Sequence, residues 1–125
     1  MTARSVVRVV LAIFFVIAGA NHFRDPALYL AMMPPWVPSP DLLQRIAGAA
    51  EIAGGIGLLL PSLRRAAGWG LIALMVAVFP ANLYVAQVGH LGDLEMPPWA
   101  LWIRLPFQLA FIGALVWVAL TPKKA

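Results

Sequence analysis

The residues most able to do chemistry are single polar side chains that interrupt long apolar runs. Glu51 is the one ionisable residue in the run 46–60, IAGAAEIAGGIGLLL. A carboxylate at the centre of a bilayer costs roughly 2.5 kcal/mol or more, so Glu51 should face protein or a wet cavity. A buried carboxyl group is also suited to exchanging a proton with a ligand.

Other apolar runs carry polar residues at depths similar to that of Glu51. Arg104 and Gln108 lie one helical turn apart, on a single face of the last run. In a bundle of helices, each helix would then contribute a polar residue to a shared interior. The candidate ligand-binding residues are Asn21, His22, Glu51, Asn82, Arg104 and Gln108. No catalytic residue is assigned.

Two interpretations of these polar residues stay open. In the first, Glu51 and Arg104 neutralise each other and the amides tie the helices together. In the second, they line a pocket for a small polar or quinone-like head group. Arg104 would then bind an anion or a carbonyl oxygen, and Glu51 would act as a titratable acid.

The composition identifies the class of protein that must position these residues. Of the 125 residues, 62% are hydrophobic and 11% are charged, and the mean hydropathy is +0.88, which indicates an integral membrane protein. The net charge of +4 fits membrane orientation and is not a nucleic-acid signal. Because the chain has no cysteine, disulfides, thiol redox chemistry and thiolate metal sites are excluded.

Four apolar runs of about 20 residues predict an all-α membrane protein, a four-helix bundle in a single domain, 1–125. Small residues lie three and four positions from Glu51, so neighbouring helices should approach it closely. Pro80 should cause a kink or a bound polar group beside the carbonyl of Val76. The transmembrane helices are expected at about 4–23, 42–60, 66–88 and 99–120.

The segment before the second span carries several prolines and cannot be one helix. A short interfacial helix is expected at 26–33, with Tyr29 and Trp36 as aromatic anchors at headgroup depth. The first span has an alternative interpretation as a secretory signal, because a basic start and an apolar core precede Ala18-Gly19-Ala20.

Charge predicts the orientation of the bundle. The basic residues at one end of the spans are Arg4, Arg8, Arg64, Arg65, Lys123 and Lys124. The mixed charges at the other end are Arg24, Asp25, Asp41, His90, Asp93 and Glu95. By the positive-inside rule, both termini are cytoplasmic and the two Pro-Trp loops face outward.

The chain also contains an internal repeat. The string MPPW at 33–36 recurs at 96–99, and Ala20-Asn21 recurs as Ala81-Asn82. The matches fall at equivalent topological positions. We therefore expect two parallel-repeat helical hairpins, 1–61 and 62–125.

Two H-x-x-D strings, His22 to Asp25 and His90 to Asp93, lie near Glu95 on the expected outer face. Imidazole and carboxylate groups could bind a divalent metal there. The two strings do not align under the repeat, and loop histidines are mostly solvated, so no metal site is assigned.

Three strings carry a resemblance to a known family: GANHFRDPALYLAMMPPWVP, AGAAEIAGGIGLLLPSLRRAAGWGL, and VFPANLYVA followed by RLPFQ. Together they resemble the DoxX-like family of small bacterial membrane proteins, over nearly the whole chain. The resemblance implies a four-helix, multi-pass protein of the bacterial cytoplasmic (inner) membrane. The family is named after a subunit linked to thiosulfate:quinone oxidoreduction, and some members associate with redox or detoxifying enzymes.

The leading hypothesis is a membrane protein that binds a lipid-soluble, quinone-like ligand in an outward-opening polar interior, as an accessory to a redox or stress-response system. Its expected partners are the lipid bilayer and either a membrane redox protein or a second copy of the chain, and no cofactor beyond a quinone is implied. The alternatives are a structural or assembly subunit without a ligand and a small-molecule transporter. No catalytic activity of its own is expected.

Overall fold

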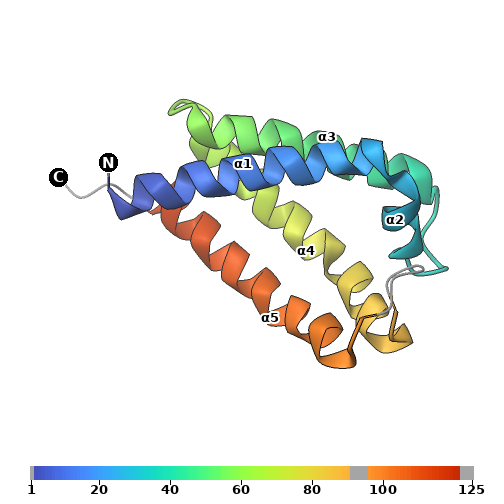
Figure 1. The fold of residues 1–125 in the computed structure, drawn as a ribbon. Helices are drawn as coiled ribbons and strands as arrows, with labels where there is room; N and C mark the ends of the chain where they lie inside the picture. The colour runs from blue at the N-terminus through green and yellow to red at the C-terminus, as the bar shows by residue number, and fades with distance from the viewer. Residues whose placement is uncertain (1, 91–95, 122–125) are drawn as a thin grey trace.

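Helices make up the regular secondary structure of residues 2–90 and 96–121, which are the residues that this computed structural model describes (Figure 1). The short helix α2 follows α1, and η1 is a π-helical continuation of α5. The elements are α1 (Ala3–Arg24), α2 (Pro26–Ala31), α3 (Pro40–Leu59), α4 (Arg64–Val88), α5 (Pro98–Leu115) and η1 (Val116–Leu120).

Four of these helices are long and apolar enough to cross a membrane: α1, α3, α4, and α5 together with η1. They have 22, 20, 25 and 23 residues, and 20 residues already span about 30 Å in an α-helix. Each lies where the sequence predicted a span, with ends shifted by at most two residues. By length and composition, the chain is thus a multi-pass, all-helical membrane protein.

Local signals fix where the helices begin and end. The Thr2 hydroxyl accepts a hydrogen bond from the backbone N–H of Ser5 at 3.1 Å and caps α1. Helices α2, α3 and α5 each begin at a proline, whose fixed φ angle suits the first helical position. Helix α4 ends at Val88 and is capped by Gly89, which has a φ of 84° that favours glycine.

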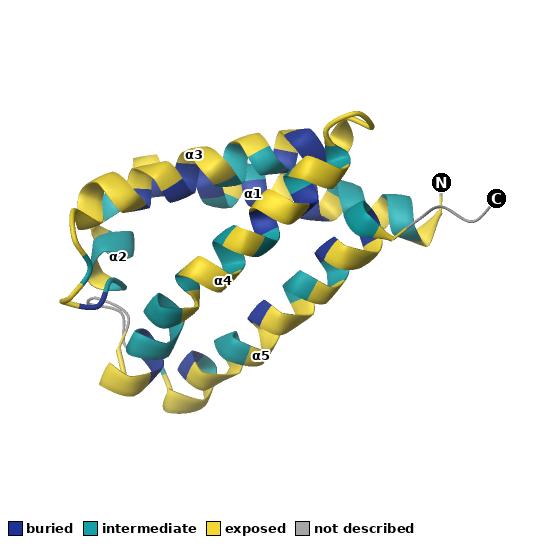
Figure 2. Ribbon diagram, turned by 180° about the vertical axis from the view of Figure 1, so that it is seen from behind, coloured by how far each residue is buried: buried dark blue, intermediate teal, exposed yellow. Residues whose placement is uncertain are grey.

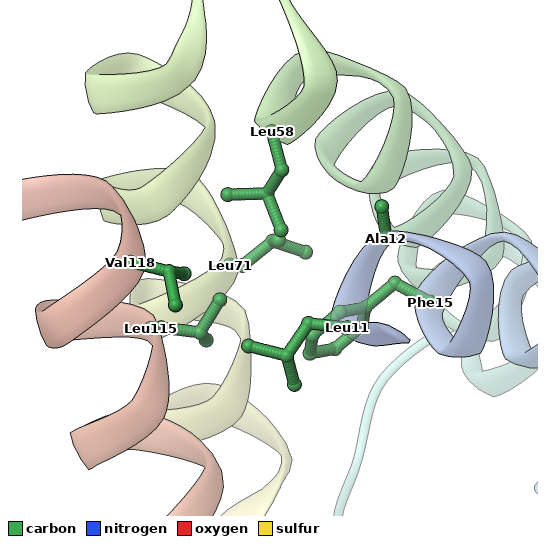
Figure 3. Packing of buried hydrophobic residues seen from close by; sticks show 7 residues of the cluster. All are labelled: Leu11, Ala12, Phe15, Leu58, Leu71, Leu115 and Val118. Atoms are coloured by element: carbon green, nitrogen blue, oxygen red, sulfur yellow. The ribbon is translucent and has the colours of Figure 1, made fainter. Parts of the chain in front are cut away.

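Helices α1 and α3 lie side by side along their length, whereas α1 and α5 meet near the chain termini and diverge toward α2 (Figure 1). We call these two ends of the bundle the terminal end and the α2 end. Toward the terminal end, all four spans contribute to one apolar core (Figure 3). Its buried residues are Leu11, Ala12, Phe15, Leu58, Leu71, Leu115 and Val118. A smaller cluster joins α4 to α5 near the α2 end.

The outward faces of the helices are largely exposed, as the yellow surfaces of Figure 2 show. On α1, the exposed side chains include Val10, Ile13 and Ile17, each more than half accessible. Exposed apolar side chains on this scale would be unfavourable in water, and they are what a helix surface in contact with lipid carries.

At the terminal end, arginine side chains bind backbone carbonyls at the C-terminal ends of helices. Arg64 Nε donates to the Leu58 carbonyl of α3 at 2.9 Å, and Arg8 Nη2 donates to the Val118 carbonyl of η1 at 2.9 Å. Cations at these positions satisfy the last carbonyls of a helix and complement its dipole. The basic cluster therefore has a structural role as well as its expected role in orientation.

Candidate functional site

The site begins with the close approach of α1 and α3. A Cβ atom added at Gly48 would lie 2.6 Å from Cβ of His22 and 2.9 Å from the carbonyl oxygen of Gly19. Only glycine fits there without moving a backbone. The small residues around Glu51 thus allow a neighbouring helix to approach, as the sequence predicted, and the helix that does so carries His22.

This packing brings His22 to Glu51. Nε2 of His22 lies 3.2 Å from Oε2 of Glu51, and the two side chains are 8% and 13% exposed. The acid does not pair with Arg104: within residues 2–90 and 96–121, the side-chain ion pairs of the structure are His22–Glu51 and Asp41–Arg45. The interpretation in which Glu51 and Arg104 neutralise each other is therefore wrong, because α3 packs along α1 whereas α5 diverges from α1.

Gln44 fixes the hydrogen on the His22 ring. The Gln44 side-chain amide donates through Nε2 to Oδ1 of Asp41 at 3.3 Å, so the Gln44 Oε1 atom is left to face Nδ1 of His22, also at 3.3 Å. An amide oxygen only accepts, and the hydrogen-bond network thus assigns the proton to Nδ1. Tyr29 stacks on the other face of the ring, with 3.6 Å between ring centroids.

Oε2 of Glu51 lies 3.2 Å from Nε2 of His22 but makes no hydrogen bond to any described residue. A carboxyl oxygen can donate a hydrogen bond when it is protonated and accept one when it is ionised. Oε2 is therefore available to an oxygen atom of a ligand that binds beside it.

A second polar group joins α4 to α5. The Asn82 amide donates to Oε1 of Gln108, and the Gln108 amide in turn donates to the backbone carbonyl of Met75. The Met75 carbonyl lies one residue before the Val76 carbonyl, which is the one that loses its backbone donor at Pro80. The polar group expected at Val76 is therefore found on Met75 instead, and α4 continues through Pro80 as one helix.

Arg104 of α5 is half-buried, and its Nη1 atom is buried without a hydrogen-bond partner in the part of the chain that the structure describes. A guanidinium group stays charged in proteins and has five N–H donors. Arg104 therefore offers unused donors to anything that binds beside it.

These side chains surround one cavity of about 360 Å³. Its polar wall includes five of the six candidate residues: His22, Glu51, Asn82, Arg104 and Gln108. The sixth, Asn21, does not line it; its amide donates to the Tyr29 hydroxyl and accepts from Arg24 Nε, each at 2.8 Å. Asn21 therefore holds Tyr29 in place from behind. The apolar lining is Phe14, Ala18, Met32, Met33, Ala47, Met75, Val78, Ala81, Phe107 and Phe111.

A protein-family model matches residues 11–119, a range that contains every residue lining this cavity. The chain belongs to the family described as a domain of unknown function, DUF8561. No curated protein and no solved structure matches the chain. For this DUF8561 protein, the chemistry of the cavity is therefore the basis for any functional proposal.

The sequence did not identify two residues that shape the site. Tyr29 was expected as an interface anchor, but it is half-buried and lines the cavity against His22, while Trp36 is 71% exposed. Gln44 lies two helical turns before Glu51 on the same face, so its spacing was a usable signal. Tyr29 had no such signal, because only the fold of the loop after α1 brings it back over His22.

The residues of the two H-x-x-D strings do not come together as a metal site in the described chain. No group of three or more His, Asp or Glu side chains gathers within residues 2–90 and 96–121. Both ring nitrogens of His22 already face Gln44 and Glu51. Asp93 and Glu95 lie outside the described residues.

Proposed function

We propose that this protein binds a small lipid-soluble ligand with a quinone-like head group in the cavity between its four spans. The observation that carries the proposal is Arg104, whose buried Nη1 has no hydrogen-bond partner among the described residues and which lines a mostly apolar cavity. A buried polar group without a partner is costly, so it points to a binding partner from outside the chain.

The polar lining suits a head group with two oxygen atoms. Arg104 would donate to one carbonyl oxygen, and a protonated Glu51 carboxyl group would donate to the other. The aromatic side chains of Phe107 and Phe111 would pack against the ring. The cavity volume of about 360 Å³ lies in the range of small-molecule sites.

The proposed setting is the bacterial cytoplasmic membrane, with both termini cytoplasmic and the protein acting as an accessory to a redox or stress-response system. The arginines at the terminal end and the resemblance to DoxX-like proteins support this placement. The chain has no cysteine, so Ser39→Cys and Ser62→Cys would each introduce a single thiol. An impermeant maleimide should label the first in intact cells and the second only after lysis.

We also propose that the chain arose by duplication of a helical hairpin. Asn21 and Asn82, equivalent under the repeat, both lie near the α2 end and both hydrogen-bond a neighbouring side chain. In the present fold they differ in role, because Asn82 lines the cavity and Asn21 does not.

Binding is tested directly with a decyl-substituted 1,4-benzoquinone and detergent-purified protein. We expect saturable binding that Arg104→Gln and Glu51→Gln weaken, while Arg65→Gln, a matched change at the terminal end, leaves it unchanged. Normal abundance with lost binding supports a ligand site. Lost abundance without any binding by the parent protein supports a purely structural subunit, and flux in proteoliposomes would indicate a transporter.

A further inference from the structure

The cavity lining contains a guanidinium group without an acidic partner among the described residues. Its ionisable lining residues are His22, Tyr29, Glu51 and Arg104. The acid, Glu51, lies 3.2 Å from His22, and a tyrosine hydroxyl is ordinarily neutral. The guanidinium of Arg104 has no ion pair with any residue in 2–90 or 96–121. Arg104 is therefore a cation whose charge no described residue balances in an ion pair.

A cation in a low-dielectric site is stabilised most by an anion held in contact with it. The acid of the lining, Glu51, faces His22 and makes no ion pair with Arg104. The Gln108 amide is already committed to Asn82 and to the Met75 carbonyl. Arg104, whose Nη1 has no hydrogen-bond partner among the described residues, is the permanently charged donor that remains for an anionic oxygen.

The apolar wall shows where the rest of the ligand would lie. Phe14 of α1 and Phe107 of α5 line the cavity, yet they are 44% and 57% exposed on the lipid-facing surface. Toward the terminal end, Phe14 stacks on Phe111 at 4.9 Å and closes the space between the two helices. Phe14 and Phe107 thus place part of the rim of the cavity on α1 and α5, two helices that diverge toward the α2 end (Figure 1).

We propose that the ligand is a lipid-soluble monoanion, whose charged oxygen binds Arg104 and whose apolar tail leaves the cavity between α1 and α5. This inference rests on the proposed function, since it uses the same cavity, and it specifies the charge of the ligand. A long-chain carboxylate and the ionised enol of a hydroxyquinone share the required chemistry, an oxyanion on an apolar body.

Two matched pairs of compounds test the charge in nanodiscs of zwitterionic phosphatidylcholine. The first pair is hexadecanoate and hexadecanol. The second is a 2-hydroxy-3-alkyl-1,4-naphthoquinone, ionised at neutral pH, and its 2-methoxy ether. A charge-assisted hydrogen bond contributes about 1.5–3 kcal/mol, so in at least one pair the anion should bind about 10- to 150-fold more tightly.

Variants test whether Arg104 causes the preference for the anion over its neutral analogue. Arg104→Gln should abolish this preference, whereas Arg104→Lys should keep part of it and Arg65→Gln all of it. If Arg104→Gln does not fold, Arg104→Lys still tests the inference. Lysine keeps one positive charge and loses the guanidinium group, so the preference for the anion should be smaller than in the parent protein but still present.

Each outcome has one meaning. A preference confined to the carboxylate or to the hydroxyquinone supports the inference and identifies the source of the anion. Equal, saturable binding of the methoxy quinone and the anion overturns the inference and leaves the proposed function standing. An anion preference that Arg104→Gln does not change also overturns it. Failure of all four compounds to bind contradicts the proposed function itself.

Discussion

Gly48→Ala tests whether the close packing of α1 against α3 positions His22 on Glu51. The new Cβ would lie 2.6 Å from His22 Cβ and 2.9 Å from the Gly19 carbonyl oxygen, where ordinary contacts begin near 3.4 Å. Because one neighbour is backbone, α1 must move away. Overpacking of this kind costs about 1–3 kcal/mol. The His22–Glu51 contact, now 3.2 Å, should lengthen with it.

Gly70→Ala is the matched control, because a Cβ at Gly70 meets nothing within 4 Å. Both substitutions gain the same helix preference of alanine over glycine, about 0.5–1 kcal/mol. The difference between them in thermal unfolding, followed by circular dichroism in detergent, therefore isolates the clash. We expect Gly48→Ala to melt several degrees below Gly70→Ala and to bind ligand more weakly. Equal melting temperatures would refute the close approach of the two helices.

Three further predictions concern the buried polar groups and the terminal end. Glu51→Gln should change stability by less than about 1 kcal/mol, because the new amide can donate to Nε2 of His22. His22→Leu removes the partner of the acid and should cost about 1–3 kcal/mol. Thermal unfolding of the two variants measures this difference. Gln108→Leu should cost about 1–2 kcal/mol by denaturant titration in micelles, since it leaves Asn82 without its acceptor. Arg64→Gln should lower stability by about 0.3–1 kcal/mol in low salt and by less in high salt, because the cation at the end of α3 is screened; a loss unaffected by salt would argue against the dipole term.

The spans could be predicted from the sequence because each depends on local composition. A run of about 20 apolar residues bounded by arginine, proline or glycine is sufficient to define a helix such as α4. The tertiary arrangement could not be predicted in the same way. Nothing in the sequence indicates that α5 diverges from α1, and this divergence opens the cavity and separates Arg104 from Glu51.

The residues of the candidate site could be predicted from the sequence, but the contacts between them could not. Intramembrane polar residues are few, so hydropathy alone selects His22, Glu51 and Arg104 as its members. Which of them touch depends on helix packing, and the glycines at positions 19 and 48 favour His22 as the partner of the acid. Tyr29 illustrates the limit, because its position over the His22 ring depends on the turn between α1 and α2.

The most direct test of the central claim is native mass spectrometry of the protein released from its own membrane with its lipids. A bound small molecule should appear at one copy per chain, persist in Arg65→Gln, and be lost or strongly reduced in Arg104→Gln. Identical spectra for the parent protein and Arg104→Gln, or no bound molecule across several detergents, would contradict a ligand site in this cavity.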